Sequence, residues 1–122
     1  MLLHDATSFL ALGESYTIGA GVLLRDCWPV QLVRRLRGLG VPMQDPWIIA
    51  QNSWTTRDLM DDIQRAHMDH SLDLVTLLIG VNNQYQGEAV SDYRLDLKDL
   101  LKQAFGFAED RPSHVLVLSI PD

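Results

Sequence analysis

The chain has 122 residues, of which 47 % are hydrophobic, and this is enough apolar material for one core but not for two, so a single domain over residues 1–122 is expected. The 10 Lys and Arg residues are outnumbered by 16 Asp and Glu residues, and the net charge of -6 disfavours nucleic acid and anionic membranes as partners. Cys27 is the only cysteine, which excludes an internal disulfide and a metal site made of several thiolates. Because the start of the sequence also shows no signal-peptide pattern, we expect a cytoplasmic protein.

Four apolar segments are predicted to form strands. In chain order they cover Phe9–Gly13, Trp47–Ala50, residues 74–79 and residues 115–120. The last two segments show no alternation of polar and apolar residues, which is typical of parallel strands that are covered on both faces. Trp47 is expected in the core, and Trp54, in the turn after the second segment, is expected at the border of a cleft.

Helical patterns lie between these strands. The first runs from Pro29 to Gly38, since proline suits a first helical turn and glycine suits a helix end. The second is expected to be capped by Thr55 or Thr56, and the third begins near Ser91. Alternation of strand and helix predicts a doubly wound parallel α/β sheet with helices on both faces.

A turn rich in small polar residues follows each of the first three predicted strands. The turns are Gly-Glu-Ser at 13–15, Gln-Asn-Ser-Trp-Thr-Thr at 51–56 and Gly-Val-Asn-Asn at 80–83. Because parallel strands end at one edge of the sheet, where α/β proteins bind their ligands, the three turns should meet there. A serine nucleophile needs hydrogen-bond donors for its oxyanion, which backbone N–H groups and asparagine supply. Taken singly, Ser15 and Asn82 are also typical of helix caps and turns.

Taken in order, these turns resemble the sequence blocks of the GDSL, or SGNH, hydrolase family. Residues 13–15 are similar to the first block, Gly-Asp-Ser, and residues 80–83 to the third, Gly-x-Asn-Asp. The resemblance implies a three-layer α/β/α flavodoxin-like fold with Ser15 as catalytic nucleophile. It also implies that the oxyanion is bound by the backbone N–H groups of Ser15 and Ser53 and by the side-chain amide of Asn82.

The sequence departs from the family pattern at several positions. Glu14 replaces Asp, Ser53 replaces Gly and Asn83 replaces Asp. The Cβ atom of a serine restricts positive φ, so Ser53 fits its turn less easily than glycine. The family's fourth block, Asp-x-x-His, supplies the general base and has no counterpart before Asp122. We therefore expect the amino-terminal part of a longer hydrolase, lacking its last strand and helix and inactive on its own.

None of the histidines is expected to replace the missing base. His114 precedes the fourth predicted strand and so belongs to the edge opposite the three turns, and His4 lies in the amino-terminal tail. His67 and His70 have a helical spacing that suggests a metal pair, but two ligands on an exposed helix rarely make a site. They are expected to be solvated, and no metal or cofactor is expected.

The leading hypothesis is a serine ester hydrolase that acts on small acyl or acetyl esters through an acyl-enzyme at Ser15. The alternative is a non-catalytic module of the same fold that binds carbohydrate or acyl groups. A phosphate or nucleotide binder that uses the first turn is weaker, because Glu14 places a negative charge there. The expected partner is a small ester, and the sequence leaves the oligomeric state open.

Overall fold

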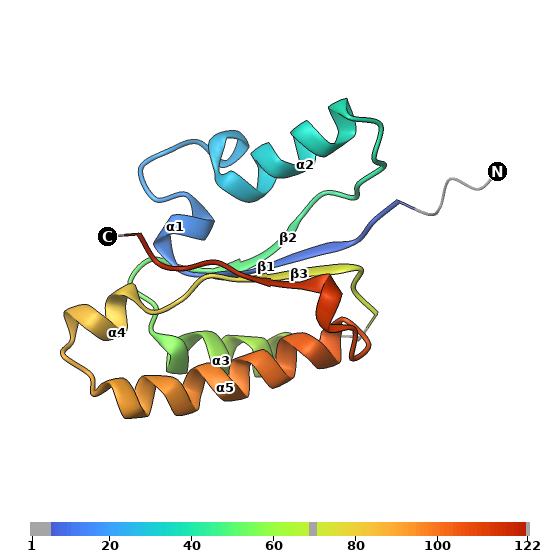
Figure 1. Cartoon of the computed structure of the whole chain (residues 1–122). Helices are drawn as coiled ribbons and strands as arrows, with labels where there is room; N and C mark the ends of the chain where they lie inside the picture. The colour runs from blue at the N-terminus through green and yellow to red at the C-terminus, as the bar shows by residue number, and fades with distance from the viewer. Residues whose placement is uncertain (1–5, 69–70, 122) are drawn as a thin grey trace.

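The computed structural model describes residues 6–68 and 71–121, which form a four-stranded parallel sheet in the order β2-β1-β3-β4 (Figure 1). The strands are β1 Phe9–Gly13, β2 Trp47–Ala50, β3 Leu74–Leu77 and β4 Val115–Val117. β1 is buried throughout because it has a strand on each side and helices above and below. The parallel sheet predicted from the apolar segments is confirmed.

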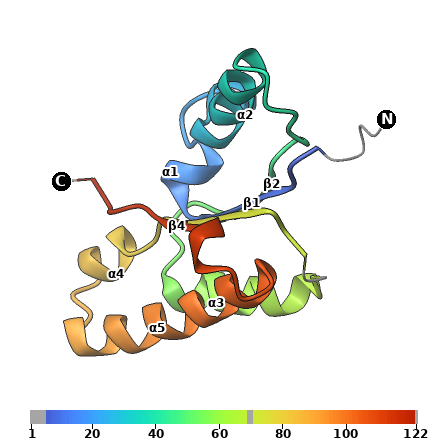
Figure 2. The ribbon, with the colours of Figure 1, turned by 45° about the vertical axis from the view of Figure 1, so that its right-hand side comes forward.

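Helices cover both faces of this sheet. The helices are α1 Ser15–Ile18, α2 Trp28–Gly38, α3 Thr56–Ala66, α4 Val81–Tyr85 and α5 Val90–Phe107, with short 3₁₀ turns at Leu24–Asp26 and Pro112–His114. Helices α1 and α2 lie on one face, whereas α3 and α5 lie side by side on the other, with α4 beside them where β3 ends (Figures 1 and 2). The predicted three-layer α/β/α architecture is confirmed.

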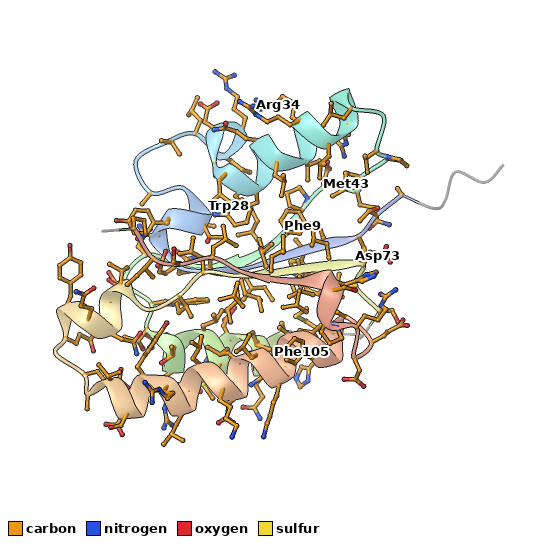
Figure 3. All side chains as sticks on the ribbon, viewed as in Figure 1. Phe9, Trp28, Arg34, Met43, Asp73 and Phe105 are labelled. Carbon is orange, nitrogen blue, oxygen red and sulfur yellow. The ribbon has the colours of Figure 1, made fainter. Side chains whose placement is uncertain are left out.

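Alternate side chains of β1 point to two separate apolar clusters. Leu10 and Leu12 pack toward α3 and α5, and Phe9 and Ala11 pack toward α2. On the α2 side, the rings of Phe9 and Trp28 lie 6.1 Å apart between centroids, and Figure 3 shows both in the layer between helix and sheet. Burial on both faces explains why β1 is apolar without alternation.

The carboxyl ends of the first three strands lie side by side. Gly13 pairs with Ala50, and Leu12 pairs with Leu77. The backbone N–H of Leu78 donates to the Leu12 carbonyl at 3.0 Å, so the pairing continues just past β3. The register therefore brings the three polar turns to one edge of the sheet, as the sequence predicted.

Several details differ from the sequence predictions. β3 and β4 are shorter than their apolar segments, and the short helices α1 and α4 were not predicted. Trp47 is 44 % exposed rather than in the core, because it opens an edge strand that has a neighbour on one side only. Trp54 is partly buried against the α3 and α5 cluster. No helix in the described ranges is long and apolar enough to cross a membrane.

Candidate active site

Ser15 stands at the start of α1, immediately after the turn that ends β1. Glu14 is the N-cap of this helix, and its carboxylate accepts a hydrogen bond of 2.8 Å from the backbone N–H of Tyr16. Ser15 is partly buried, and its hydroxyl has no hydrogen-bond partner within residues 6–68 and 71–121. The hydroxyl is therefore not committed to capping the helix, which was the competing interpretation of Ser15.

Gly13 is the residue that allows this turn to form. A Cβ atom at this position would lie 2.7 Å from the Cβ of Thr17 and 3.0 Å from the carbonyl oxygen of Leu78. The Thr17 hydroxyl is fixed in turn, because it accepts a hydrogen bond of 3.3 Å from the indole nitrogen of Trp28. The first turn thus needs glycine for close packing rather than for an unusual backbone angle.

The carboxyl group of Glu14 is fully buried beside the proposed nucleophile. Burial raises the pKa of Glu14 above its ordinary value, and hydrogen bonds from the backbone N–H groups of Tyr16 and Glu14 oppose this shift only in part. One carboxyl oxygen, Oε2, has no partner among the described residues. Glu14, which stands where the family pattern has Asp, therefore caps α1 through its other carboxyl oxygen.

Ser53 lies in the left-handed backbone region, with φ of 69°. This is the conformation that glycine adopts freely and that costs other residues roughly 1–2 kcal/mol. The turn is closed by a hydrogen bond of 3.4 Å from the backbone N–H of Trp54 to the Gln51 carbonyl. Ser53 is exposed, and its own backbone N–H has no acceptor within the described ranges. The turn therefore adopts a left-handed backbone conformation at Ser53 despite the restriction that its Cβ imposes.

Asn82 joins the third turn to the second. It is the second residue of α4, and its Nδ2 donates a hydrogen bond of 2.9 Å to the backbone carbonyl of Trp54, next to Ser53. An asparagine amide has two hydrogens, so one remains available for a ligand. Gly80, which precedes α4, has φ of 139° and faces the Tyr93 hydroxyl, which donates to the Ile79 carbonyl at 2.7 Å.

Asn83 lies at the centre of a buried polar network that the sequence did not reveal. It is 2 % exposed, and its Oδ1 accepts from the backbone N–H of Thr56 at 3.1 Å. Its Nδ2 donates to the Thr56 hydroxyl at 2.9 Å and to the carboxylate of Glu88. A carboxylate at position 83 has no hydrogens to donate, so asparagine suits these partners better than the family's aspartate. The only sign of this network in the sequence was the replacement of the family's Asp by Asn83.

The threonine pair at the start of α3 is structural. Thr55 caps the helix in a reciprocal capping box with Asp58, which confirms the predicted cap. The Thr56 hydroxyl donates to the buried carboxylate of Asp96 on α5 at 2.8 Å, and the Arg57 Nε lies 3.3 Å from the same carboxylate. The second turn is therefore held to both α4 and α5.

A hollow of about 370 Å³ adjoins the first and third turns. It is lined by Tyr16, which follows Ser15, and by Val81, which precedes Asn82. Tyr85 contributes a second aromatic side chain. The lining thus includes the sequence neighbours of Ser15 and Asn82, but neither Ser15 nor Asn82 itself lines the hollow.

The described histidines lie at the opposite edge of the sheet. His67 is exposed and ends α3, and the His114 Nδ1 lies 2.8 Å from the Asp73 carbonyl just before β4. His4 and His70 lie outside the described residues, and the suggested metal pair of His67 and His70 therefore lies partly outside them. Within the described part of the chain, no cluster of three or more potential metal ligands occurs.

A parallel α/β/α sheet with a Gly-Glu-Ser turn after its first strand and a Gly-Val-Asn-Asn turn after its third defines a protein of the SGNH-hydrolase class. The sequence profile of the GDSL-like Lipase/Acylhydrolase family matches residues 11–119. The chain belongs to this family, and the resemblance drawn from its three turns is confirmed.

Solved structures show the same fold. AlinE4, an SGNH-hydrolase family esterase, has a TM-score of 0.77 at 20 % identity, with 93 % of this chain and 58 % of that chain covered. TesA has a TM-score of 0.76 at 18 % identity, with 93 % and 59 % covered. The psychrotrophic esterase EstA from Pseudoalteromonas sp. has a TM-score of 0.72 at 16 % identity, with 94 % and 61 % covered. The chain thus spans about three-fifths of these proteins. A search of curated protein sequences found no match.

Proposed function

We propose that this chain provides the nucleophile and the oxyanion-binding groups of a serine ester hydrolase that acts on small acyl or acetyl esters. The observation that carries the proposal is the uncommitted hydroxyl of Ser15, at the edge where the second and third turns are joined by the bond from Asn82 to Trp54. Membership of the GDSL-like lipase/acylhydrolase family supports hydrolase chemistry.

In the proposed reaction, Ser15 Oγ attacks the ester carbonyl carbon and gives its proton to a general base, and the carbonyl oxygen becomes an oxyanion. The backbone N–H groups of Ser15 and Ser53 and the second amide hydrogen of Asn82 donate to that oxyanion. Loss of one such donor typically lowers kcat by about 10²–10³-fold. The ester C–O bond then breaks, the alcohol leaves with a proton, and water hydrolyses the acyl-enzyme.

The general base has no candidate beside Ser15 in the described ranges. The 122-residue sequence contains no Asp-x-x-His motif, and the chain spans 58 % of AlinE4. We propose that in the whole enzyme the base is the histidine of that family motif. We also propose a cytoplasmic setting, which the single cysteine favours.

The alternative is a non-catalytic module that binds carbohydrate or acyl groups in the hollow beside Ser15. It is favoured by the lack of a described histidine near the serine and by the aromatic lining from Tyr16 and Tyr85. Aromatic walls suit both sugar rings and acyl groups, so the hollow alone does not separate the two functions.

A fluorophosphonate probe separates them, because it forms a phosphorus–oxygen bond with an activated serine and releases fluoride. The structure of EstA was determined in a state inhibited by monoethylphosphonate. We expect slow labelling of this chain at Ser15, faster labelling when imidazole is added as an external base, and none in Ser15→Ala. Mass spectrometry of the digested protein identifies the site.

The outcome against the hydrolase is equally clear. If the folded chain is not labelled at Ser15 even with imidazole, the binding module is the better description. In a longer parent, hydrolysis of short p-nitrophenyl esters that persists in Ser15→Ala would also contradict the assignment. Circular dichroism of Ser15→Ala controls for loss of fold.

A further inference from the structure

A second hollow, of about 450 Å³, lies between α2 and the edge strand β2. It shares no lining residue with the hollow beside Ser15. Its floor is aliphatic, with Val30 and Val33 from α2 and Ile48 from β2. The exposed side chain of Leu24, from the 3₁₀ turn before α2, extends this apolar surface outward. The size is in the range of about 300–1,000 Å³ that is typical of small-molecule pockets.

The rim of this hollow is basic, although the chain as a whole carries a net charge of -6. Arg25, Arg34 and Arg37 all line it, together with the carboxylate of Asp45. Figure 3 shows Arg34 on α2, away from the layer that contains Phe9 and Trp28, so the charged group of Arg34 lies on the solvent side of α2.

Only one of these guanidinium groups is neutralised within the described ranges. Arg37 forms an ion pair with Asp45 at 3.0 Å and donates to the Met43 carbonyl at 2.8 Å. Arg34 donates a hydrogen bond of 2.7 Å to the backbone carbonyl of Arg25. In the described part of the chain, no carboxylate lies within ion-pair distance of the Arg25 or the Arg34 guanidinium group. Two like charges without counter-ions therefore face the same hollow, and an anion bound between them relieves their repulsion.

We propose that this hollow binds a free anionic amphiphile, namely an alkyl carboxylate with its head group at Arg25 and Arg34 and its chain on Val30, Val33 and Ile48. The floor offers no aromatic ring on which a nucleobase or sugar stacks, and its aliphatic side chains match a hydrocarbon chain. The basic rim selects an anion over a neutral or cationic head group. The site does not depend on Ser15 and is a binding site separate from the candidate active site.

The first test varies the ligand and keeps the chain unchanged. Decanoate below its micelle concentration is titrated into the folded chain and followed by ¹H–¹⁵N NMR, beside decanol, acetate and decyltrimethylammonium. We expect decanoate to shift the amides of α2 and β2 and to bind at least about fivefold more tightly than decanol, with no binding of acetate or the cation. Shortening the carboxylate should weaken binding by up to about fourfold per methylene, from roughly 0.8 kcal/mol per buried CH₂. Equal binding of decanoate and decanol would overturn the proposal.

The second test varies the protein. Arg25→Gln and Arg34→Gln should each weaken decanoate binding by about fivefold to tenfold, and decanol binding should not change. Arg35→Gln is the matched control, because Arg35 is an exposed arginine of the same helix that does not line the hollow. Ser15→Ala should retain full affinity, so this result is independent of any esterase activity. An equal loss in Arg34→Gln and Arg35→Gln would mean non-specific charge attraction and would overturn the site.

A third arm separates a free ligand from a membrane surface. The chain is sedimented with vesicles of neutral lipid and with vesicles that contain an anionic lipid, in the absence of decanoate. We expect the chain to remain in the supernatant with both. Association with anionic vesicles, combined with no NMR shifts from free decanoate, would reject the proposed ligand in favour of a lipid surface.

Discussion

The side-chain amide of Asn82 donates a hydrogen bond of 2.9 Å to the backbone carbonyl of Trp54. The two residues are 28 positions apart, and the bond holds the turn after β3 against the turn after β2. Ser53 is the neighbour of Trp54, so this bond sets the spacing between two of the proposed oxyanion donors. One hydrogen of the Asn82 amide thus makes this bond, and the second is available to a ligand.

Loss of this bond should loosen the second turn without unfolding the chain. We expect Asn82→Ala to lower the free energy of unfolding by about 1 kcal/mol, the usual net value of one hydrogen bond. The amide signals of Ser53 and Trp54 should shift in the ¹H–¹⁵N spectrum. Gln86→Ala, at the exposed end of α4, is the control and should stay within about 0.5 kcal/mol of the parent. Unchanged Ser53 and Trp54 signals in Asn82→Ala would contradict the role of this hydrogen bond in holding the second turn.

The contact between Asn83 and Glu88 should depend on asparagine. In Asn83→Asp two carboxylates face each other and the donors to Glu88 and Thr56 are lost, so we expect a loss of about 2 kcal/mol or more at neutral pH. The loss should shrink in acid, where one carboxyl group is protonated and donates to the other. Adding Glu88→Gln restores a donor and should recover part of the stability in urea denaturation. A double variant no more stable than Asn83→Asp would argue against this pairing.

Glu14 should make stability fall as the pH rises. Because burial raises its folded-state pKa above the ordinary value of 4.5, the folded chain binds more protons at this site than the unfolded chain in the window just above 4.5. Stability from this group is therefore complete below that window and decreases through it. Glu14→Gln should remove this pH-dependent loss of stability. The melting temperature of the variant relative to that of the parent should therefore rise as the pH increases above 4.5. Glu109→Gln, an exposed replacement, controls for net charge.

The close packing at Gly13 gives a matched pair of glycine variants. Gly13→Ala forces a Cβ against Thr17 and the Leu78 carbonyl, so we expect a loss of about 1–3 kcal/mol. Gly38 is the last residue of α2, and no atom lies within 4 Å of a Cβ added there. Gly38→Ala should therefore be neutral or stabilising by up to about 1 kcal/mol. Chemical denaturation of both variants measures the difference. Equal effects would mean that the first turn tolerates a side chain.

The sequence predicted the elements whose signals are local. The apolar run of β1 and the Thr55 cap are each recognised within a few residues, so composition and spacing were sufficient. It missed α1 and α4, which have four and five residues and are too short for a helical period to show. It misplaced Trp47 because strand order, which makes β2 an edge, is not encoded in the segment itself.

The sequence by itself determined the family, the alternation of strand and helix and the identity of the polar residues that follow each strand, because these depend on residue type and short spacing. Only the tertiary structure decided that Asn83 bridges Thr56 and Glu88, that Asn82 binds the Trp54 carbonyl and that Arg25 and Arg34 share a hollow over an aliphatic floor. Strand register and helix packing bring together residues that are distant along the chain, and hydrogen bonds and ion pairs follow distance in space rather than distance in sequence.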